Sequence, residues 1–490
     1  MQRAMWPAFL FVLFLILISS PMALPRTLVI PLIVACALFM EQMDSTVIST
    51  SLPVLAVDMG VDPISLKLAL TSYLVSLAVF IPISGWMADR FGVLTIFRSA
   101  ICVFMLGSIL CGVSQTLPQF VVARFFQGIG GAMMVPVGRL VVLRSVEKAN
   151  LVKALSYLTM PAMLGPVLGP PLGGFITTYF HWRWIFFINI PMSVLGLYLA
   201  TRFIVNTKEP HDAPLDWLGF VLSALGCSLV MLGLATAGRH LVDGDVSLAC
   251  VLLGSASLAA YVWHARRVAH PLIDLALLKI GTLQAGVFGG SLFRLGIGAI
   301  PFLLPLMLQL GFGFNAFHSG LLTCASAAGA MFMKTIAAKV LQRYGFRRVM
   351  IVNGTCGVIS LAAIGLFNQG TPYFVMLIVL LIGGCFRSLQ FTSLNAISYA
   401  DVDNHRLSQA TSIASVAQQL SVGMGVVLGG FALQASNHWQ GHATLVAQDF
   451  WPAFLTVALA AACSIPLLRR LPANAGAELA GRDVAAKAAA

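Results

Sequence analysis

The feature that most constrains this chain is a succession of long apolar segments that runs from Leu28 to Leu468. Crossing the hydrocarbon core of a bilayer takes about 20 mostly apolar residues, and these segments supply that length repeatedly. Inside a bilayer, only helices and closed barrels satisfy all of their backbone hydrogen-bonding groups. These segments are continuous and rich in Leu, Ala and Gly, without the alternation of barrel strands. The sequence therefore predicts an all-α, polytopic membrane protein.

We expect fourteen membrane spans in this chain. The composition agrees, because 59% of the residues are hydrophobic and only 9% are charged, which is unlike a soluble globular domain. The joins between the apolar segments are short and contain turn-forming residues. The expected spans cover residues 27–52, 66–87, 94–114, 118–142, 152–176, 184–204, 216–236, 247–265, 282–308, 319–340, 349–367, 372–397, 408–434 and 450–468.

The positive charge is unevenly distributed among the joins. A net charge of +12 would suit a nucleic-acid partner, but Lys and Arg stand mainly at the ends of the apolar segments. One alternating set of joins holds nearly all of them, whereas the opposite set holds only Lys67, Arg183 and Arg239. By the positive-inside rule, both termini of the mature chain are expected in the cytoplasm, and no nucleic-acid partner is expected.

Two halves of the chain carry similar turns. Residues 88–92, which end in Gly92, stand after the second expected span, and residues 341–345, which end in Gly345, stand after the tenth. A second echo relates residues 168–174 to residues 427–430. Duplicated halves with a binding site between them are typical of secondary transporters. We expect an N-terminal extension (1–25), a six-helix bundle (26–208), two inserted spans with a linker (209–280), a second six-helix bundle (281–470) and a disordered cytoplasmic tail (471–490).

The first residues allow three interpretations. Arg3 followed by the apolar run from Trp6 to Ile18 is similar to a signal sequence, but it also fits a short additional apolar segment. A third interpretation is that the natural start is Met22. The sequence leaves these alternatives open.

Four stretches in the N-terminal half resemble, in order, the motifs of the 14-span drug:proton antiporters of the major facilitator superfamily. The loop stretch departs from the family pattern, since Val93 and Leu94 stand where two basic residues are usual. The resemblance implies the major-facilitator fold and a bacterial multidrug-resistance-type exporter. The residues that carry it are Asp44, Thr46, Leu52 and Pro53; Gly85, Asp89, Arg90 and Gly92; Arg124, Gln127 and Gly128; and Gly165, Pro166, Gly169, Pro170, Gly173 and Gly174, followed by residues 182–191.

The charged residues inside the N-terminal spans are candidates for proton coupling. A charge at mid-membrane is costly unless it is paired or hydrated, so it indicates function by default. Asp44 and Glu41 lie one helical turn apart and could take and release a proton, while Arg124 could hold a nearby carboxyl ionised. The alternatives are hydrogen-bonding roles for Asp44 and Arg124, and substrate contact or a solvated wall for Glu41. Gln127 could share the network, and Met40 could line an adaptable apolar cavity.

The two glycine-containing motifs are interpreted as conformational elements. In the loop motif, formed by Gly85, Asp89, Arg90 and Gly92, the acid could pair with a helix N-terminus of the other bundle or remain a solvated loop residue. In the antiporter motif, small residues at four-residue spacing let helices approach closely, and the prolines bend the span. These residues are Gly165, Pro166, Gly169, Pro170, Gly173 and Gly174.

The C-terminal half supplies a second set of polar residues within apolar spans. By the repeat, the ninth and twelfth spans correspond to the first and fourth spans. In the family that the sequence resembles, those two spans line the central cavity. Two arginines without an acid in these two spans favour an anion-tolerant wall. The set comprises Arg294, Gln309, Arg387, Gln390 and Asn395.

The function expected from these features is proton-coupled export of amphiphilic small molecules by alternating access. The alternatives are export of an organic acid or metal-chelate anion, and a membrane receptor that does not transport. No HExxH, GxSxG or Walker A spacing occurs, and the nine cysteines show no metal-ligand spacing. We therefore expect no catalytic residue, no metal and no cofactor. The expected partners are the substrate, protons and the lipid bilayer, with the chain acting as a monomer.

Overall fold

The computed structural model describes residues 26–61, 66–162, 164–208, 214–236, 244–314, 316–441 and 446–480, and these residues form helices and turns without a strand. The first half contains α2 (Arg26–Met59), α3 (Lys67–Phe80), α4 (Ser84–Phe91), α5 (Val93–Val113), α6 (Leu117–Ser145), η2 (Lys148–Asn150), α7 (Leu151–Ala162), α8 (Leu164–Tyr179), α9 (Trp184–Phe187) and α10 (Asn189–Phe203). The expected all-α, polytopic architecture is confirmed.

The second half follows two intervening helices, α11 (Trp217–Thr236) and α12 (Gly244–Ala265). Its elements are η3 (Leu275–Lys279), α13 (Gly281–Gln284), η4 (Ala285–Gly289), α14 (Gly290–Gly298), α15 (Ile300–Leu306), η5 (Met307–Gly311), α16 (Ala316–Tyr344), α17 (Phe346–Gly365), α18 (Tyr373–Ile397), η6 (Asn404–Arg406), α19 (Leu407–Gln440), η7 (Ala447–Asp449), α20 (Phe450–Ala462) and α21 (Ser464–Arg469).

Twelve helices in the described residues are long and apolar enough to cross a membrane. Counting the bent pair Ala69–Phe80 and Ser84–Phe91, whose axes differ by 57°, as one span makes thirteen. The remaining expected span, 152–176, is divided between α7 and α8, and residue 163 between them lies outside the described residues. The count of fourteen therefore stays a prediction.

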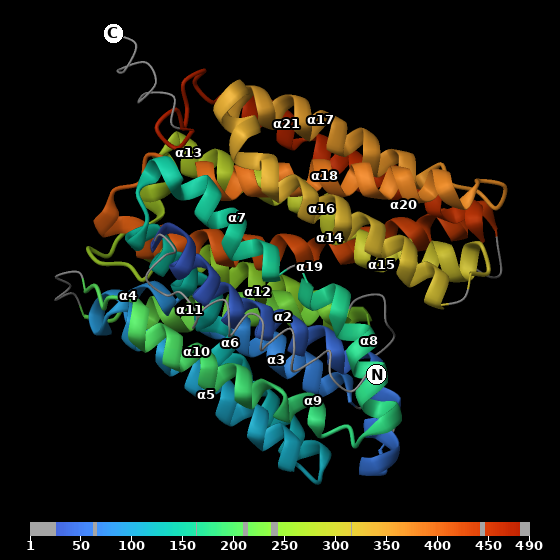
Figure 1. The fold of residues 1–490 in the computed structure, drawn as a ribbon, viewed down its shortest axis with the longest axis horizontal. Coiled ribbons are helices and arrows are strands. Elements are labelled where there is room, and N and C mark those ends of the chain that lie inside the picture. The colour runs from blue at the N-terminus through green and yellow to red at the C-terminus, as the bar shows by residue number, and fades with distance from the viewer. Residues whose placement is uncertain are drawn as a thin grey trace.

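Figure 1 shows two groups of helices, α2 to α10 in one and α13 to α21 in the other. The two intervening helices, α11 and α12, pack on each other, and α11 also packs against α3 of the first group and α19 of the second. Contacts between the groups come mainly from α19 with α4 and α6, and from α7 with α16 and α18. The intervening pair therefore lies beside the junction of the two halves.

The repeated turns seen in the sequence have the same backbone form. Gly92 joins α4 to α5 with φ of 92°, and Gly345 joins α16 to α17 with φ of 78°. Positive φ is readily adopted by glycine, which lacks a Cβ atom. The surrounding helices differ, because α3 and α4 are bent relative to each other whereas α16 is continuous. The first span of the second half also differs from α2, since it contains two π-helical turns, η4 and η5.

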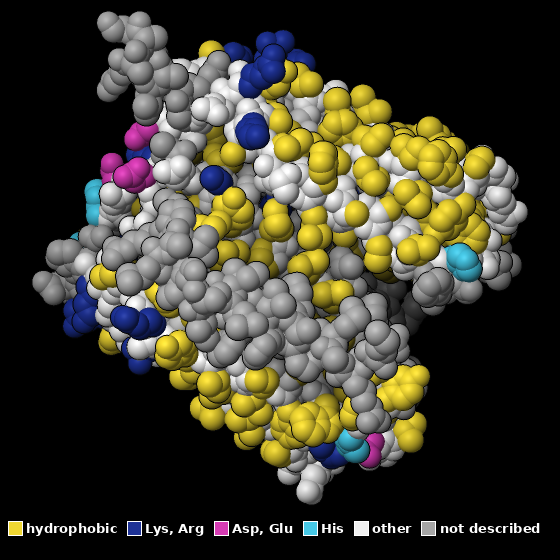
Figure 2. Space-filling model, in the orientation of Figure 1, with side chains coloured by type: hydrophobic (Ala, Val, Ile, Leu, Met, Phe, Trp, Pro, Cys, Tyr) yellow, Lys and Arg dark blue, Asp and Glu magenta, His cyan; other side chains and the backbone are white. Residues whose placement is uncertain are grey.

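Charged and apolar side chains separate on the surface. In Figure 2, Lys and Arg gather at the end that carries α4, and hydrophobic side chains cover the flanks of both groups. We call this end the basic end; among its exposed residues are Arg90, Arg343 and Arg469. The opposite end, which carries Asp58 and Arg183, is called the far end. Apolar flanks between polar ends are what a lipid environment requires.

The two predicted terminal segments are only partly described. The N-terminal extension (1–25) and residues 481–490 of the tail lie outside the described residues. Residues 471–480 form consecutive turns in which Leu471 and Leu479 are buried. This part of the tail packs on the helices because its two leucines remove apolar surface from water.

Candidate functional site

A buried ion pair lies in the middle of the first half. Asp44 of α2 and Arg124 of α6 are 1% and 0% exposed, and Nη1 of the guanidinium donates to Oδ2 of the carboxylate at 2.7 Å. The other oxygen, Oδ1, accepts hydrogen bonds from Nε2 of Gln127 at 3.0 Å and from Nδ2 of Asn189 at 2.9 Å. Three donors thus converge on one buried carboxylate.

This network joins four helices. Ser108 of α5 accepts hydrogen bonds from Gln127 at 2.8 Å and from Asn189 at 3.1 Å, while the side chain of Arg124 also donates to Oε1 of Gln127 at 2.6 Å. The carboxylate of Asp44 therefore holds α2, α6 and α10 together, with α5 one hydrogen bond further. Losing one partner of a buried ion pair destabilises the fold, because the other charge stays buried without a counter-ion. We therefore expect a change in charge at Asp44 to affect the packing of all four helices.

A second carboxyl group lies one turn before the first. Glu41 is 5% exposed and accepts hydrogen bonds from Tyr73 at 3.4 Å and from Gln42 at 3.1 Å. The guanidinium carbon of Arg124 is 4.6 Å from the centre of the Tyr73 ring, so this ring links the two carboxyl groups. Among the described residues, Glu41 has no ion-pair partner. Glu41 therefore differs from Asp44, because in this part of the chain only neutral groups donate hydrogen bonds to it and no described arginine pairs with it.

The antiporter motif packs directly on the turn of α2 that carries Asp44. A Cβ atom on Gly165 would lie 2.9 Å from the backbone nitrogen of Met43, and one on Gly169 would lie 2.1 Å from Oγ1 of Thr46. The Thr46 hydroxyl also donates to the carbonyl of Gly165 at 3.3 Å. These glycines therefore set the distance between α8 and α2. Gly173, Pro166, Pro170 and Gly174 belong to the same helix, and the side-chain surroundings of the last three lie outside the described residues.

The loop motif connects the two halves at the basic end. Asp89 of α4 forms an ion pair with Arg144 of α6 at 2.8 Å and also accepts a hydrogen bond from Ser408, the second residue of α19. Beside it, Ser412 of α19 accepts from the backbone nitrogen of Gly85 at 3.1 Å. A carboxylate at a helix N-terminus is favourable because the exposed backbone N–H groups there are partially positive. Arg90 is exposed at the same end.

A residue outside the motif stabilises its last turn. Asn206, after α10, accepts a hydrogen bond from the backbone nitrogen of Leu94 at 3.1 Å and donates to Thr95 at 3.1 Å. A Cβ atom on Gly92 would lie 2.4 Å from the Asn206 side chain. The turn is therefore stabilised by an amide, in a segment where the family pattern has basic residues and this chain has Val93 and Leu94.

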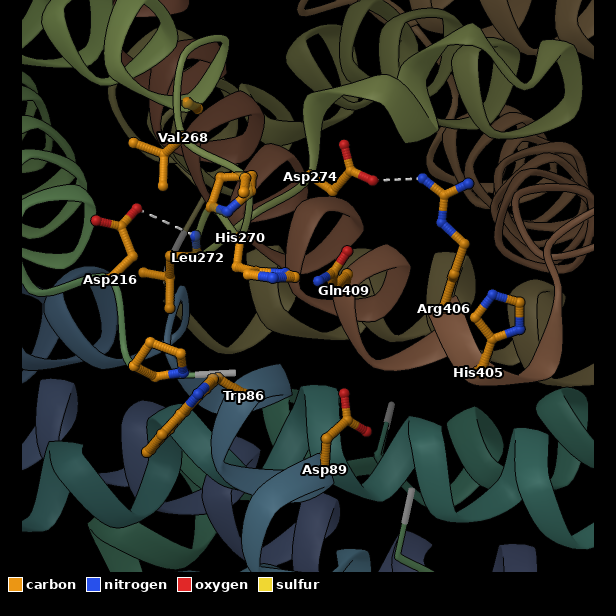
Figure 3. A pocket seen from close by; sticks show the side chains of 14 residues that line it. Trp86, Asp89, Asp216, Val268, His270, Leu272, Asp274, His405, Arg406 and Gln409 are labelled. Carbon is orange, nitrogen blue, oxygen red and sulfur yellow. Dashed lines mark hydrogen bonds and ion pairs between the residues drawn. The ribbon is translucent and has the colours of Figure 1, made fainter. Parts of the chain in front are cut away.

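A cavity of about 350 Å³ opens at the basic end, between α4, the linker after α12 and α19. Figure 3 shows Trp86 and Asp89 on one side of it, with Asp216, Asp274 and Arg406 on the others. Asp274 forms an ion pair with Arg406, and Asp216 accepts from His264 at 2.8 Å. These contacts attach the linker to α11, α12 and α19. None of the cavity residues belongs to the Asp44 network, so this cavity is separate from the buried charges.

The second half contains buried cations of a different kind. Arg294 of α14, Lys334 of α16 and Arg387 of α18 are 3%, 4% and 9% exposed. The Arg294 guanidinium donates to Oδ1 of Asn395 at 3.0 Å, Lys334 donates to Oγ1 of Thr392 at 3.1 Å, and Arg387 donates to the Ser326 hydroxyl. In the described residues, none of the three forms an ion pair. We call these three residues the cationic cluster.

Three predicted cavity residues form no hydrogen bond with either group of charges in the described structure. Met40 faces α10, where its sulfur accepts a hydrogen bond from Ser193 at 3.2 Å. Gln390 faces α17, because it donates to the carbonyl of Met350 and accepts from Asn353. Gln309 is exposed in η5, whose Gly311 accepts a hydrogen bond from Gln369 in the join before α18. Their positions show that helix rotation, rather than membership of a span, decides which polar residues meet.

Three buried polar residues were missed as site candidates from sequence. Asn189 lies within the Trp-containing stretch 182–191, but its spacing does not reveal that it reaches Asp44. Lys334 is a single basic residue within an apolar segment, which was the signal available. Arg139 of α6 reaches across the halves to Tyr399 at 3.2 Å and to Gln418 at 3.4 Å.

Two groups of helices with a repeated turn, a buried acid and arginine between helices, and a loop motif joining the halves are the features of a membrane transporter. The family model of the Major Facilitator Superfamily matches residues 34–277 and 286–489 of this chain. The chain belongs to this family, and it is a transporter rather than an enzyme. The resemblance inferred from the sequence motifs is confirmed.

Similar curated proteins come from enterobacteria. The chain is 37% identical over 454 residues to a protein of Serratia proteamaculans named multidrug resistance protein MdtD, covering 91% of this chain and 92% of that protein. It is 39% identical over 405 residues to the protein of the same name from Enterobacter sp. (strain 638), covering 82% and 85% of the two chains.

Solved structures share the fold at low sequence identity. The human organic anion transporter MFSD10 superposes with a TM-score of 0.64 at 13% identity, covering 91% of this chain and 100% of that one. The proton:xylose symporter XylE, bound to 6-bromo-6-deoxy-D-glucose, superposes with a TM-score of 0.62 at 16% identity, covering 94% and 99%. At these identities the likeness establishes the fold, and function is argued from the site.

Proposed function

We propose that this protein is a proton-coupled exporter of amphiphilic small molecules that works by alternating access, as in multidrug efflux. The observation that carries the proposal is the buried pair of Asp44 and Arg124, together with the nearby unpaired carboxyl group of Glu41. Ionisable groups inside a membrane are costly and mark pathways for ions or substrates. The names of the enterobacterial relatives support efflux of drug-like molecules as the direction and cargo.

Protonation of Asp44 gives the coupling step. A proton on the carboxylate cancels its charge, so Arg124 loses its counter-ion and the hydrogen bonds from Gln127 and Asn189 weaken. The helices that these bonds join, α2, α6 and α10, then become free to change their relative positions. Glu41, which has only neutral donors, is placed to pass the proton along the same face of α2.

The contacts at the basic end supply the second state of the cycle. The bonds of Asp89 with Ser408 and of Gly85 with Ser412 cross between the halves there. In Figure 1, the two groups of helices diverge toward the end of α8 and α9. We assign the basic end to the cytoplasm of a bacterial inner membrane, following the positive-inside rule. The described arrangement then corresponds to a state closed toward the cytoplasm, and export requires these bonds to break and reform.

The test is transport into everted membrane vesicles with and without an imposed proton gradient. A panel of one cationic dye, one neutral amphiphile and one aromatic carboxylate covers the substrate classes. We expect Asp44→Asn to lower gradient-driven uptake at least about tenfold, since it leaves a residue of the same shape that does not ionise. Asp245→Asn, an exposed acid at the start of α12, is the matched control and should transport normally. Unchanged gradient-driven uptake in Asp44→Asn would falsify the coupling role.

A further inference from the structure

The cationic cluster lies along one face of α18. Arg387, Phe391 and Asn395 are spaced four residues apart, so their side chains lie on the same side of this helix. Eight residues of α-helix span about 12 Å, which is the length of the stripe. Arg294 approaches the stripe at Asn395, from α14, and Lys334 approaches it at Thr392, from α16. Two helices, α14 and α16, therefore bring cations to the end of the stripe near Asn395. The Arg387 guanidinium lies at the other end, where its Nη1 is 2.9 Å from the position of a Cβ atom on Gly383.

One aromatic ring lies between two of these cations. The guanidinium carbon of Arg294 is 5.4 Å from the centre of the Phe391 ring, and Nζ of Lys334 is 6.0 Å from the same centre. Both distances are measured to the same ring centre, so the separation of the two cationic groups is at most the sum of these two distances. Phe391 is only partly buried. An aromatic face flanked by two positive charges suits a ligand that combines a flat apolar group with an anionic group.

No acid of this half can neutralise the cluster. Between residues 281 and 400 the sequence contains no Asp or Glu. The buried acid of this half, Asp449, precedes α20 and accepts hydrogen bonds from Asn437 and the backbone of Val446. The cluster also contains donors that lack an acceptor in the described structure, namely Nε of Arg294 and Nη1 of Arg387. Buried polar groups are nearly always satisfied, so these donors are able to bond an acceptor from outside the chain. Nε of Arg124 lacks an acceptor in the same way, and the absence of an acid between residues 281 and 400 is what distinguishes the second half.

We propose that Arg294 and Lys334 form an anion site that binds the carboxylate of an aromatic or otherwise amphiphilic substrate, with Phe391 contacting its apolar part and Arg387 adding positive charge from further along α18. The inference rests on the proposed function, because it names the class of molecule that the exporter carries. A carboxylate bound beside Phe391 accepts a hydrogen bond from the unpaired Nε of Arg294 and lies between the charges of Arg294 and Lys334. The charge of Arg387 acts on it from the other end of the stripe. The positive charge in the second half then selects against lipophilic cations, by repulsion.

The test measures binding to the purified full-length protein in neutral detergent, where no proton gradient acts. The probes are 2-naphthoate and its uncharged counterpart 2-naphthamide, titrated by calorimetry. We expect naphthoate to bind at least tenfold more tightly than the amide. Lys334→Gln should weaken naphthoate binding about 10- to 100-fold, the effect expected for one charge-assisted hydrogen bond. Arg387→Gln should weaken it less, because the charge of Arg387 acts from a greater distance. Binding of the amide should change little.

Two controls separate charge from folding. Lys339→Gln removes an exposed cation from the same helix, α16, and should bind naphthoate like the wild type. Lys334→Arg retains the charge and should retain most of the preference for the anion. Equal binding of the two probes, binding of neither at millimolar concentration, or an equal loss in Lys339→Gln overturns the proposal. Phosphatidylglycerol is titrated in parallel; if this lipid, and not naphthoate, shows the dependence on Lys334 and Arg387, the cluster is a lipid site and the proposal is wrong.

The experiment distinguishes this proposal from the proposed function. Naphthoate binding that depends on Lys334, combined with loss of gradient-driven uptake in Asp44→Asn, supports both. Naphthoate binding with uptake that ignores the gradient supports the anion site and refutes proton coupling. Gradient-driven uptake of the cationic dye with no preference for naphthoate keeps the exporter and overturns the anion site.

Discussion

The two halves of this transporter share an architecture but treat buried charge in opposite ways. In the first half, the guanidinium of Arg124 meets the carboxylate of Asp44 at 2.7 Å, with a second acid one turn away. In the second half, Arg294, Lys334 and Arg387 are buried among residues that include no acid from 281 to 400. The first arrangement is electrically complete without a ligand, whereas the second lacks a negative charge.

The repeat makes the comparison sharper. Lys334 precedes Gly345 by the same number of residues as Ile81 precedes Gly92. Both glycines have positive φ at equivalent joins between helices. At this register the first half bends, between α3 and α4, and carries an apolar side chain, whereas the second half continues as one helix and carries a cation. Two copies of one fold can therefore serve different purposes, one half taking part in proton transfer and the other in binding a charged molecule.

The largest effect should come from removing the paired cation. Arg124→Met leaves the buried carboxylate of Asp44 without a counter-ion, and breaking a buried pair in this way costs about 3–5 kcal/mol. We expect a clear fall in the thermal unfolding temperature in detergent. Arg98→Met, an exposed arginine of α5, is the control and should melt like the wild type. Equal melting of the two variants would mean that the pair contributes nothing to stability.

Removing an unpaired cation should have the opposite effect on stability. Lys334→Met replaces a buried charge that lacks a counter-ion by an apolar side chain of similar length, which we expect to raise stability by about 1–2 kcal/mol. The same unfolding measurement, made without any anion added, checks this. A destabilisation as large as that of Arg124→Met would show that Lys334 has a negative partner, and it would break the comparison between the halves.

The glycine motifs allow a comparison of packing. Gly165→Ala places a methyl group 2.8 Å from Cβ of Gln42 and 2.9 Å from the Met43 nitrogen, and overpacking of this kind costs about 1–3 kcal/mol. At Gly430, in the echo of this motif, the nearest atom lies 3.7 Å away, so Gly430→Ala should stabilise α19 by about 0.5–1 kcal/mol. Unfolding temperatures of opposite shift confirm the difference; a loss in both variants would contradict it.

The smallest effect belongs to an exposed acid of the first half. Trp182 donates to Asp58 at 2.8 Å and, with the nearby charge of Arg183, lowers the pKa of this carboxyl group, although partial burial opposes the shift. A lowered pKa contributes stability at pH values above the ordinary carboxyl range, and this contribution is lost as the pH falls through the lowered pKa. Because Asp58 is 39% exposed, the effect is small.

The measurement for Asp58 compares the wild type with Asp58→Asn across pH. We expect the variant to melt slightly lower at neutral pH, and the difference to disappear in acid, where the carboxyl group of the wild type is also uncharged. High salt should reduce the difference at neutral pH. A difference that grew on acidification would have the wrong sign for this carboxyl group.

The sequence predicted the part of the site that family motifs and isolated charges mark. Asp44 and Arg124 were predicted because a charge in an apolar segment is rare, and Gln127 because it follows Arg124 by one helical turn. The structure brings the three together. Asn189 was not assigned a role, since a neutral amide near the end of a span carries no such signal. Its contact with Asp44 depends on how α10 packs against α2, which spacing along the chain does not contain.

The second half was predicted less completely for the same physical reason. Gln309, Gln390 and Arg387 all lie inside apolar segments. Gln390 and Arg387 belong to α18, but only Arg387 lies on the same face of that helix as Phe391, and Gln309 belongs to η5. A small rotation of a helix about its axis decides which neighbours a polar side chain contacts. The number of spans stays a prediction because residue 163, between α7 and α8, lies outside the described residues.

The π-helical turn η4 stands shortly before Arg294. A π turn contains one residue more than the α-helical turn it replaces, and each residue of an α-helix turns the chain by about 100°. The direction of the Arg294 side chain is therefore a matter of phase as well as of residue type. A chain with one residue fewer in η4 would keep every side chain of α14 and still point this positive charge away from Asn395.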